Sequence, residues 1–193
     1  MRLFAAIDLD EGARTAIAKE QKRIAAAIDR EKALTWVAAD RMHLTLVFLG
    51  EVADAAARPM IDAMHAPIDR DPFDVVFATV GVFPADSHGR ERKPPRVLWL
   101  GVTTGADAVI AVQRAVAARL SNVGAAIEDR PFRPHLTLAR WRRSAWSDRR
   151  RVADAARSDA IAAIRVDRVT LYQSRLSSSG PSYTPLARAT LCG

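Results

Sequence analysis

One four-residue pattern, His-Leu-Thr-Leu, occurs twice in this chain, at residues 43–46 and 135–138. Successive side chains of a β-strand point to opposite faces, so each copy places its His and Thr on one face and its two Leu on the other. Each copy therefore predicts a strand that buries its leucines and presents an imidazole beside a hydroxyl. Two such strands facing each other would gather these groups around one point, a metal-free arrangement suited to acid–base chemistry on a phosphate.

The repetition of the pattern argues against a purely structural role. A single copy is equally well explained as a half-buried strand whose His and Thr satisfy each other. The chain contains four His, so a second copy of the pattern is rarely expected by chance. We therefore take His43 and His135 as candidate catalytic residues, and Thr45 and Thr137 as candidate donors to phosphate oxygens.

Length and composition predict a single globular domain over residues 1–193. The apolar share of 49% and the charged share of 26% are typical of such domains. Cys192 is the one cysteine, so no disulfide can form within the chain, which fits a reducing compartment. The apolar opening run stops at Asp8, which is too short for a signal peptide or a membrane span. We expect a cytoplasmic monomer with no membrane segment.

The net charge of +7 is concentrated in the C-terminal half of the chain. Residues 1–96 contain 14 Lys or Arg and 15 Asp or Glu, whereas residues 97–193 contain 15 Arg and 7 Asp or Glu. The planar guanidinium matches phosphate oxygens, so this half is suited to bind a polyanion such as RNA. An Arg-rich surface that merely keeps the protein hydrated is the alternative. The same two interpretations apply to a cluster made of Trp141, Trp146, Arg142, Arg143 and Arg149–Arg151.

Hydrophobic periodicity predicts an α+β fold. Expected strands cover residues 2–9, 34–37, 43–50, 73–83, 96–102, 135–140, 165–174 and 183–191; a helix should start after Asp10, and others should cover 54–64, 105–120 and 147–157. Residues 86–95 should form an exposed loop. The expected order is strand, helix, strand, motif strand, helix, strand in the first half and strand, helix, motif strand, helix, strand, strand in the second. We therefore expect a bilobal, internally duplicated protein with two mostly antiparallel sheets flanked by helices and an active site in the cleft between the lobes.

These residues resemble the two-histidine phosphoesterase superfamily, and within it the bacterial and archaeal RNA 2′,3′-cyclic phosphodiesterases, also called 2′-5′ RNA ligases. The resemblance runs nearly from end to end, and the two motif segments are its specific part. It is supported by residues 2–8, 36–37, 43–52, 96–101, 131–140, 171–174 and 183–186. It implies a bilobal fold, no metal or other cofactor, and hydrolysis of a terminal 2′,3′-cyclic phosphate to a 2′-phosphate. Its substrates would be RNA with such ends or cyclic nucleotides, with reversible 2′-5′ ligation as a further activity.

Opening a cyclic phosphodiester requires a base for the attacking water, an acid for the departing 3′-oxygen and donors for the charge on phosphorus. Histidine, with an ordinary pKa of about 6.5, suits both proton transfers, and the sequence leaves open which His does which. Arg140 follows Thr137 by three residues, and the family pattern also has an Arg there, so it is a candidate charged donor. Phe48 is a candidate to stack on a base, although strict alternation places it on the buried face with Leu44 and Leu46 unless the strand bends.

Other functions remain open at this point. The substrate could be another cyclic phosphate, such as an ADP-ribose cyclic phosphate, or a 2′-5′ linkage. A non-catalytic module that grips RNA ends is a second alternative, but paired His suit it less well than Arg or Lys. A metal hydrolase is poorly supported, because neither motif has a second His or a carboxylate at ligand spacing.

Overall fold

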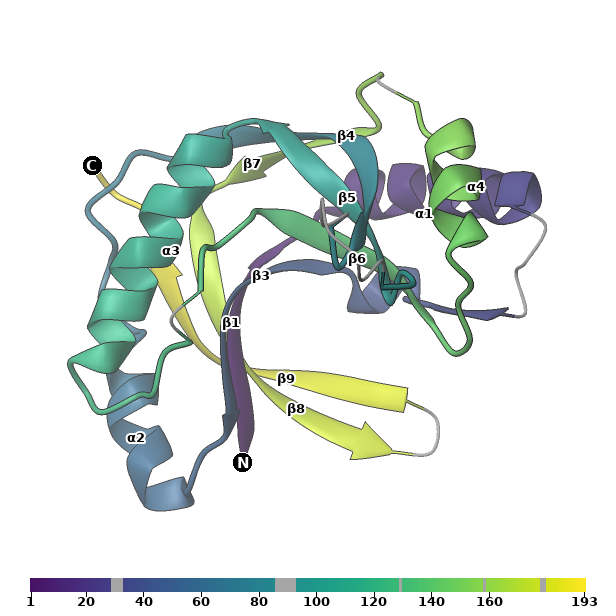
Figure 1. Cartoon of the computed structure of the whole chain (residues 1–193). Helices are drawn as coiled ribbons and strands as arrows, with labels where there is room; N and C mark the ends of the chain where they lie inside the picture. Colours follow the sequence, from purple (N-terminus) through teal and green to yellow (C-terminus); the bar gives the residue numbers. More distant parts are fainter. Residues whose placement is uncertain (29–32, 86–92, 129, 158, 178–179) are drawn as a thin grey trace.

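The computed structural model describes residues 1–28, 33–85, 93–128, 130–157, 159–177 and 180–193 (Figure 1). Its elements in chain order are β1 (Arg2–Asp8), α1 (Glu11–Ile28), β2 (Leu34–Trp36), η2 (Ala39–Arg41), β3 (His43–Glu51), α2 (Asp54–Ala63), β4 (Phe73–Phe83), β5 (Val97–Thr104), α3 (Ala106–Ser121), β6 (His135–Trp141), α4 (Ser147–Ala155), β7 (Ala162–Val166), β8 (Arg168–Ser177) and β9 (Gly180–Thr190). None of the helices in these ranges is long and apolar enough to cross a membrane.

The strands form two sheets that repeat one arrangement. The first sheet has the order β3-β1-β8-β9, the second has the order β2-β6-β5-β4-β7, and neighbouring strands pair antiparallel throughout. In each, a motif strand pairs with an earlier strand: β3 with β1, from which α1, β2 and η2 separate it in the chain, and β6 with β5, from which α3 separates it. Two further strands then extend each sheet: β8 and β9 beyond β1 in the first, and β4 and β7 beyond β5 in the second. The second sheet also has β2 at its other edge, beside β6. The α+β architecture with two antiparallel sheets is as the sequence predicted.

The helices are exchanged between the two halves. α1 follows β1 of the first sheet, yet it contacts β7 and α4, and the Gln21 amide donates to the Leu138 carbonyl of β6 at 2.9 Å. α3 follows β5 of the second sheet, yet it contacts β3 and α2. Figure 1 shows α2 and α3 on one side of the sheets and α1 and α4 on the other. Each sheet is thus covered by the helix of the other half, and the buried residues form one continuous core.

The helical stripes expected from the sequence supply much of this core. The Asp10 carboxylate accepts the Ala13 N–H at 2.7 Å, which caps the start of α1 as predicted. Apolar residues at helical spacing then face inward along both long helices, because burying such a stripe is what stabilises an amphipathic helix on a sheet. The buried residues of these stripes are Ala13, Ile17, Ile24 and Ile28 in α1 and Val109, Val112, Val116 and Leu120 in α3.

The C-terminal strands differ from the sequence prediction. We expected a single strand over 165–174, but the structure has β7 and β8, separated at Asp167. β7 pairs with β4 in the second sheet, and β8 pairs with β1 in the first. The strand-like pattern continues through the break, so local sequence does not reveal that the chain changes sheets. Of the predicted exposed loop, residues 86–92 lie outside the described residues, and Lys93 and Pro94 are exposed as expected. Pro95 is buried, so the prediction is wrong for this last residue, which lies just before β5.

Candidate active site

The two motif strands meet where the two sheets meet. β3 and β6 lie in contact, so the motifs that start at His43 and His135 come together from opposite sheets. Thr45 and Thr137 lie on the same strand faces as the His that precede them, and all four side chains are half-buried. The leucines between them, Leu44 and Leu136, are fully buried. This is the alternation expected from the sequence.

Each imidazole is held by the backbone in the same way. The Nδ1 atom of His43 lies 2.9 Å from the Arg41 carbonyl oxygen, and the Nδ1 atom of His135 lies 2.7 Å from the Arg133 carbonyl oxygen. A carbonyl oxygen only accepts, so Nδ1 carries the hydrogen in both rings and Nε2 is left for the substrate. The repeat is therefore longer than the sequence analysis recognised: it reads Arg-x-His-Leu-Thr-Leu in both copies.

A β-bulge interrupts both motif strands at the same place. In β3, Thr45 lies opposite Ala6 and Val47 opposite Ala5, so Leu46 is the extra residue. In β6, Leu138 is the extra residue in the same way. The bulge reverses the alternation after it, because one added residue moves every later side chain to the other face.

The bulge determines on which face of the strand Phe48 and Arg140 lie. Phe48 is 40% exposed and lies under the Arg2 guanidinium, 5.1 Å from the ring centroid. The expectation from strict alternation, that Phe48 is buried with the leucines, is therefore wrong. Arg140 occupies the corresponding place in β6 and is also exposed. Both candidate substrate-binding residues lie on the strand face that carries the His and Thr.

Each imidazole sits in an aromatic corner. His43 stacks on Phe4, with ring centroids 4.8 Å apart, and meets the edge of Tyr183 at 5.2 Å. His135 meets Phe83 edge-on at 4.9 Å, and Trp99 lies 6.4 Å away. Burial in these corners lowers the pKa of both His below the ordinary value, because desolvation disfavours the charged ring.

The charges around the two imidazoles differ. After burial and the hydrogen bond to the Arg41 carbonyl, Asp8 is a further influence on His43, and it raises the pKa of that ring, whereas Arg14 lowers it. At His135 the nearby charges are Arg130 and Arg140, and both lower the pKa. Of the charges near the two imidazoles, Asp8 beside His43 is the one that raises a pKa.

The Asp8 carboxylate is fixed in place beside His43. Asp8 lies directly opposite His43 in the β1–β3 ladder. Its two oxygens accept hydrogen bonds from the Tyr172 hydroxyl at 2.6 Å and the Thr170 hydroxyl at 2.8 Å. Burial and the bond to Asp8 raise the pKa of Tyr172 to about 12, so this phenol stays a neutral donor. Sequence analysis missed this group, because its members are far apart along the chain.

The chemistry of this site is that of acids, bases and anion donors. Within the described ranges, no group of three or more His, Cys, Asp or Glu side chains is placed to share a metal ion. The arrangement supplies two imidazole Nε2 atoms, two hydroxyls and one guanidinium. Such a set can move two protons and stabilise negative charge on a phosphate.

Comparisons with known proteins agree with this arrangement. The family model of the 2′-5′ RNA ligase superfamily matches residues 13–177. The chain is 30% identical over 189 residues to a protein of Archaeoglobus fulgidus named RNA 2′,3′-cyclic phosphodiesterase, covering 96% of this chain and 98% of that protein. It is 32% identical over 163 residues to a protein of the same name from Geobacillus stearothermophilus; the match covers 82% of this chain but spans about half (48%) of that longer relative.

A solved structure shows the same fold. The crystal structure of E. coli LigT complexed with 3′-AMP superposes with a TM-score of 0.73 at 28% sequence identity, covering 100% of this chain and 98% of that one. Its fold, the doubled motif and the family match are in agreement. The chain therefore belongs to the 2′-5′ RNA ligase superfamily.

Proposed function

We propose that this protein is an RNA 2′,3′-cyclic phosphodiesterase that opens a terminal 2′,3′-cyclic phosphate to a 2′-phosphate. The observation that carries this proposal is the pair of imidazoles, each locked through Nδ1 to a carbonyl two residues before it and each presenting Nε2 on the motif face. The names of the relatives support it. An in-line displacement at phosphorus needs one proton-transfer group beside the attacking oxygen and another beside the leaving oxygen, and two imidazoles held in the same way can fill these two places.

We assign the two roles from the charges around the pair. His135, beside Arg130 and Arg140, is the general base: its neutral Nε2 removes a proton from water as the water oxygen attacks phosphorus. His43, beside Asp8, is the general acid: its Nε2–H protonates the 3′-oxygen as the bond from phosphorus to that oxygen breaks. The products are a 2′-phosphate and a free 3′-hydroxyl. A second RNA's 5′-hydroxyl in place of water forms a 2′-5′ linkage.

The charge that builds up on the phosphate needs donors. Thr45 and Thr137 each lie two residues after a catalytic His, on the same face of the strand. Their hydroxyls donate to the non-bridging oxygens of the phosphate. Arg140 adds a positive charge on that face, and Phe48 offers a ring for the terminal base. These assignments of catalytic and binding residues are part of the proposal.

The decisive experiment follows the chemistry of the RNA end. Purified protein is incubated with an RNA ending in 2′,3′-cyclic phosphate, and with cyclic mononucleotides, in excess EDTA. We expect full activity and a product whose phosphate is on the 2′-oxygen. Loss of activity that a divalent ion restores would contradict the metal-independent mechanism. A 3′-phosphate product would mean that the 2′-oxygen leaves, and absence of turnover on every cyclic phosphate would refute the function.

A further inference from the structure

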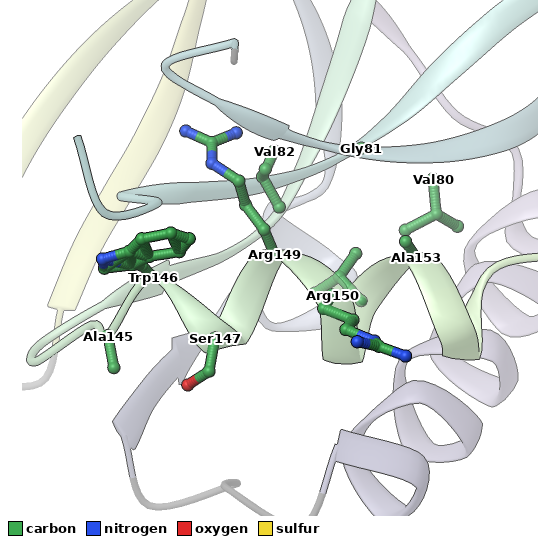
Figure 2. Close-up of a pocket in the computed structure, with 10 residues that line it drawn as sticks. Val80, Gly81, Val82, Ala145, Trp146, Ser147, Arg149, Arg150 and Ala153 are labelled. Carbon is green, nitrogen blue, oxygen red and sulfur yellow. The ribbon is translucent and has the colours of Figure 1, made fainter. Parts of the chain in front are cut away.

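A groove of about 840 Å³ lies between β4 and α4, away from the two motifs (Figure 2). Its walls are Val80, Gly81 and Val82 from β4 and Ala145, Trp146, Ser147, Arg149, Arg150, Val152 and Ala153 from α4 and the turn before it. Figure 2 shows Trp146 at the start of α4, the Arg149 side chain extending towards Val82, and Arg150 further along the helix. The groove is thus mostly apolar, with one large aromatic ring and two cations at its rim.

The aromatic ring is exposed although its backbone is firmly held. Trp146 is 47% exposed, which is unusual for a large hydrophobic side chain. Next to it, the buried Asp148 carboxylate accepts the Ala145 N–H at 2.8 Å, and the Asp148 N–H donates back to the Ala145 carbonyl at 3.1 Å. This reciprocal pair fixes the turn at the start of α4. The ring is therefore presented to solvent by a rigid segment.

The two walls of the groove are also tied together. The Arg149 guanidinium donates to the Pro84 carbonyl at 2.7 Å and to the Lys93 carbonyl at 3.0 Å, which links α4 to both ends of the β4–β5 connection. Arg151 reaches the Ile28 carbonyl of α1 at 3.4 Å. The three consecutive Arg of the candidate RNA-binding cluster thus differ: Arg149 and Arg151 hydrogen-bond to the backbone of other segments, whereas Arg150 is 88% exposed.

The charge of this region favours a polyanion. Residues 142–157 contain six Arg and two Asp. One of these acids, Asp148, is buried, and the other, Asp154, lies 3.9 Å from Arg150 in an exposed pair. Exposed pairs of this kind contribute little and are readily exchanged for another anion. An aromatic ring beside such cations is the combination that binds unpaired nucleotides through stacking and phosphate contacts.

The groove borders the catalytic face across one edge of β4. Val80 and Val82 face the groove, whereas Phe83, the next residue, contacts His135 from the other face. β7 pairs only with Phe73–Phe77 of β4, so within the described residues the outer edge of Val80–Phe83 carries no strand. Among the described residues, a chain that leaves the catalytic pair over Phe83 therefore reaches Trp146 by crossing this edge.

We propose that the β4–α4 groove binds an unpaired nucleotide of the RNA strand upstream of the reacting end, with its base stacked on Trp146 and its phosphate near Arg150. This proposal rests on the proposed function for the direction of the strand. It makes the enzyme favour RNA over cyclic mononucleotides, since a mononucleotide has no upstream base to place in the groove.

The test measures RNA binding separately from turnover. The probe is a fluorescent RNA of about ten nucleotides ending in 2′-phosphate, and its Kd is measured by anisotropy at several salt concentrations. Trp146→Ala should raise the Kd about tenfold, and Trp146→Phe should recover most of the affinity, because the stacking ring is kept. Arg150→Ala should weaken binding and reduce the salt slope by about one.

The control for the charge change is Arg58→Ala on α2. Arg58 forms the same pair at a spacing of four residues, with Asp62, and is 79% exposed, but it lies on another face of the protein. It should leave RNA binding unchanged. Equal effects of Arg58→Ala and Arg150→Ala would mean that only overall charge matters, which would overturn the assignment of the phosphate contact to Arg150.

Turnover of a cyclic mononucleotide completes the experiment. Trp146→Ala should leave its kcat/KM unchanged. An RNA Kd that Trp146→Ala does not alter, or a mononucleotide kcat/KM that falls with it, would overturn the groove as an RNA subsite. If the wild-type protein opens no cyclic phosphate, the proposed function fails, and the anisotropy measurement still decides whether the groove binds RNA.

Discussion

Position by position, β3 and β6 share their candidate catalytic groups and differ in the residues around them. Both carry a His held through Nδ1, a Thr two residues later and a bulge at the following Leu. Opposite the first His, β1 places the Asp8 carboxylate; opposite the second, β5 places Gly101, which has no side chain. After the bulge, β3 presents Phe48 where β6 presents Arg140.

In the proposed mechanism, this difference separates the two imidazoles into an acid and a base. Both imidazoles make the same hydrogen bond to the backbone, so these contacts alone would give the two rings the same pKa. Two rings with the same pKa would have no preference for the role of acid or base. Asp8 on one side and Arg140 on the other separate them by charge. A side chain at Gly101 would clash with the Thr79 hydroxyl oxygen, so a carboxylate opposite His135 would require Thr79 to shift.

The largest expected effect is the loss of either imidazole. His43→Ala and His135→Ala should each lower kcat by about 10²–10⁴-fold, because each ring has its own proton transfer. Steady-state kinetics on a cyclic mononucleotide check this, with circular dichroism to show that both variants fold. A variant that keeps more than about a tenth of the wild-type kcat would remove that His from the proposed pair.

The next effect separates the two residues that follow the bulges. Arg140→Ala should lower kcat/KM about 10- to 100-fold on both RNA and a cyclic mononucleotide, since it removes a charged donor to the reacting phosphate. Phe48→Ala should cost less than about tenfold and act mainly on KM, because stacking holds the base in the ground state as well. Equal losses in kcat for the two variants would show that the equivalent positions do the same work.

A smaller effect concerns pH. Burial lowers the pKa of both His, so the maximum of kcat/KM should lie below pH 6.5: activity rises as His135 loses its proton and falls as His43 loses its own. Asp8→Asn removes the carboxylate that raises the pKa of His43. The alkaline limb should therefore move to lower pH, with a loss of several-fold at pH 6.5 and a smaller loss in more acidic solution.

The control variant for Asp8→Asn is Asp10→Asn. It also removes one negative charge without changing the shape of the side chain, at a residue two positions away. Asp10 caps α1, and Asn caps a helix about as well as Asp. The pH profile of this variant should match the wild type. A shift of the acidic limb in Asp8→Asn, with the alkaline limb unmoved, would mean that the roles of the two His are exchanged.

The smallest effect on turnover is expected in the second aromatic corner. A Cβ at Gly81 would clash with the Trp99 ring, so Gly81→Ala must displace the ring that packs on Phe83 beside His135. Overpacking of this kind costs about 1–3 kcal/mol. Thermal unfolding should show the destabilisation, and kcat should fall modestly. Unchanged unfolding would mean that Trp99 is free to move and does not hold His135 in place.

Several features of this protein could be predicted from the sequence alone. The doubled motif identifies His43, His135, Thr45 and Thr137, and the structure places them on the faces that alternation predicts. The cap at Asp10 and the apolar stripes of the long helices follow in the same way. These features depend on neighbours a few residues apart, so local periodicity and side-chain chemistry are sufficient to find them.

The tertiary structure decided what depends on distant partners. The bulges that bring Phe48 and Arg140 to the motif face arise from the register of the motif strands against β1 and β5. The strand break at Asp167 arises because the chain pairs with β4 of one sheet before this residue and with β1 of the other sheet after it. The exchange of α1 and α3 and the pairing of Asp8 with Tyr172 also join segments far apart in sequence. No local pattern encodes such contacts, because only packing of the whole chain selects one register over another.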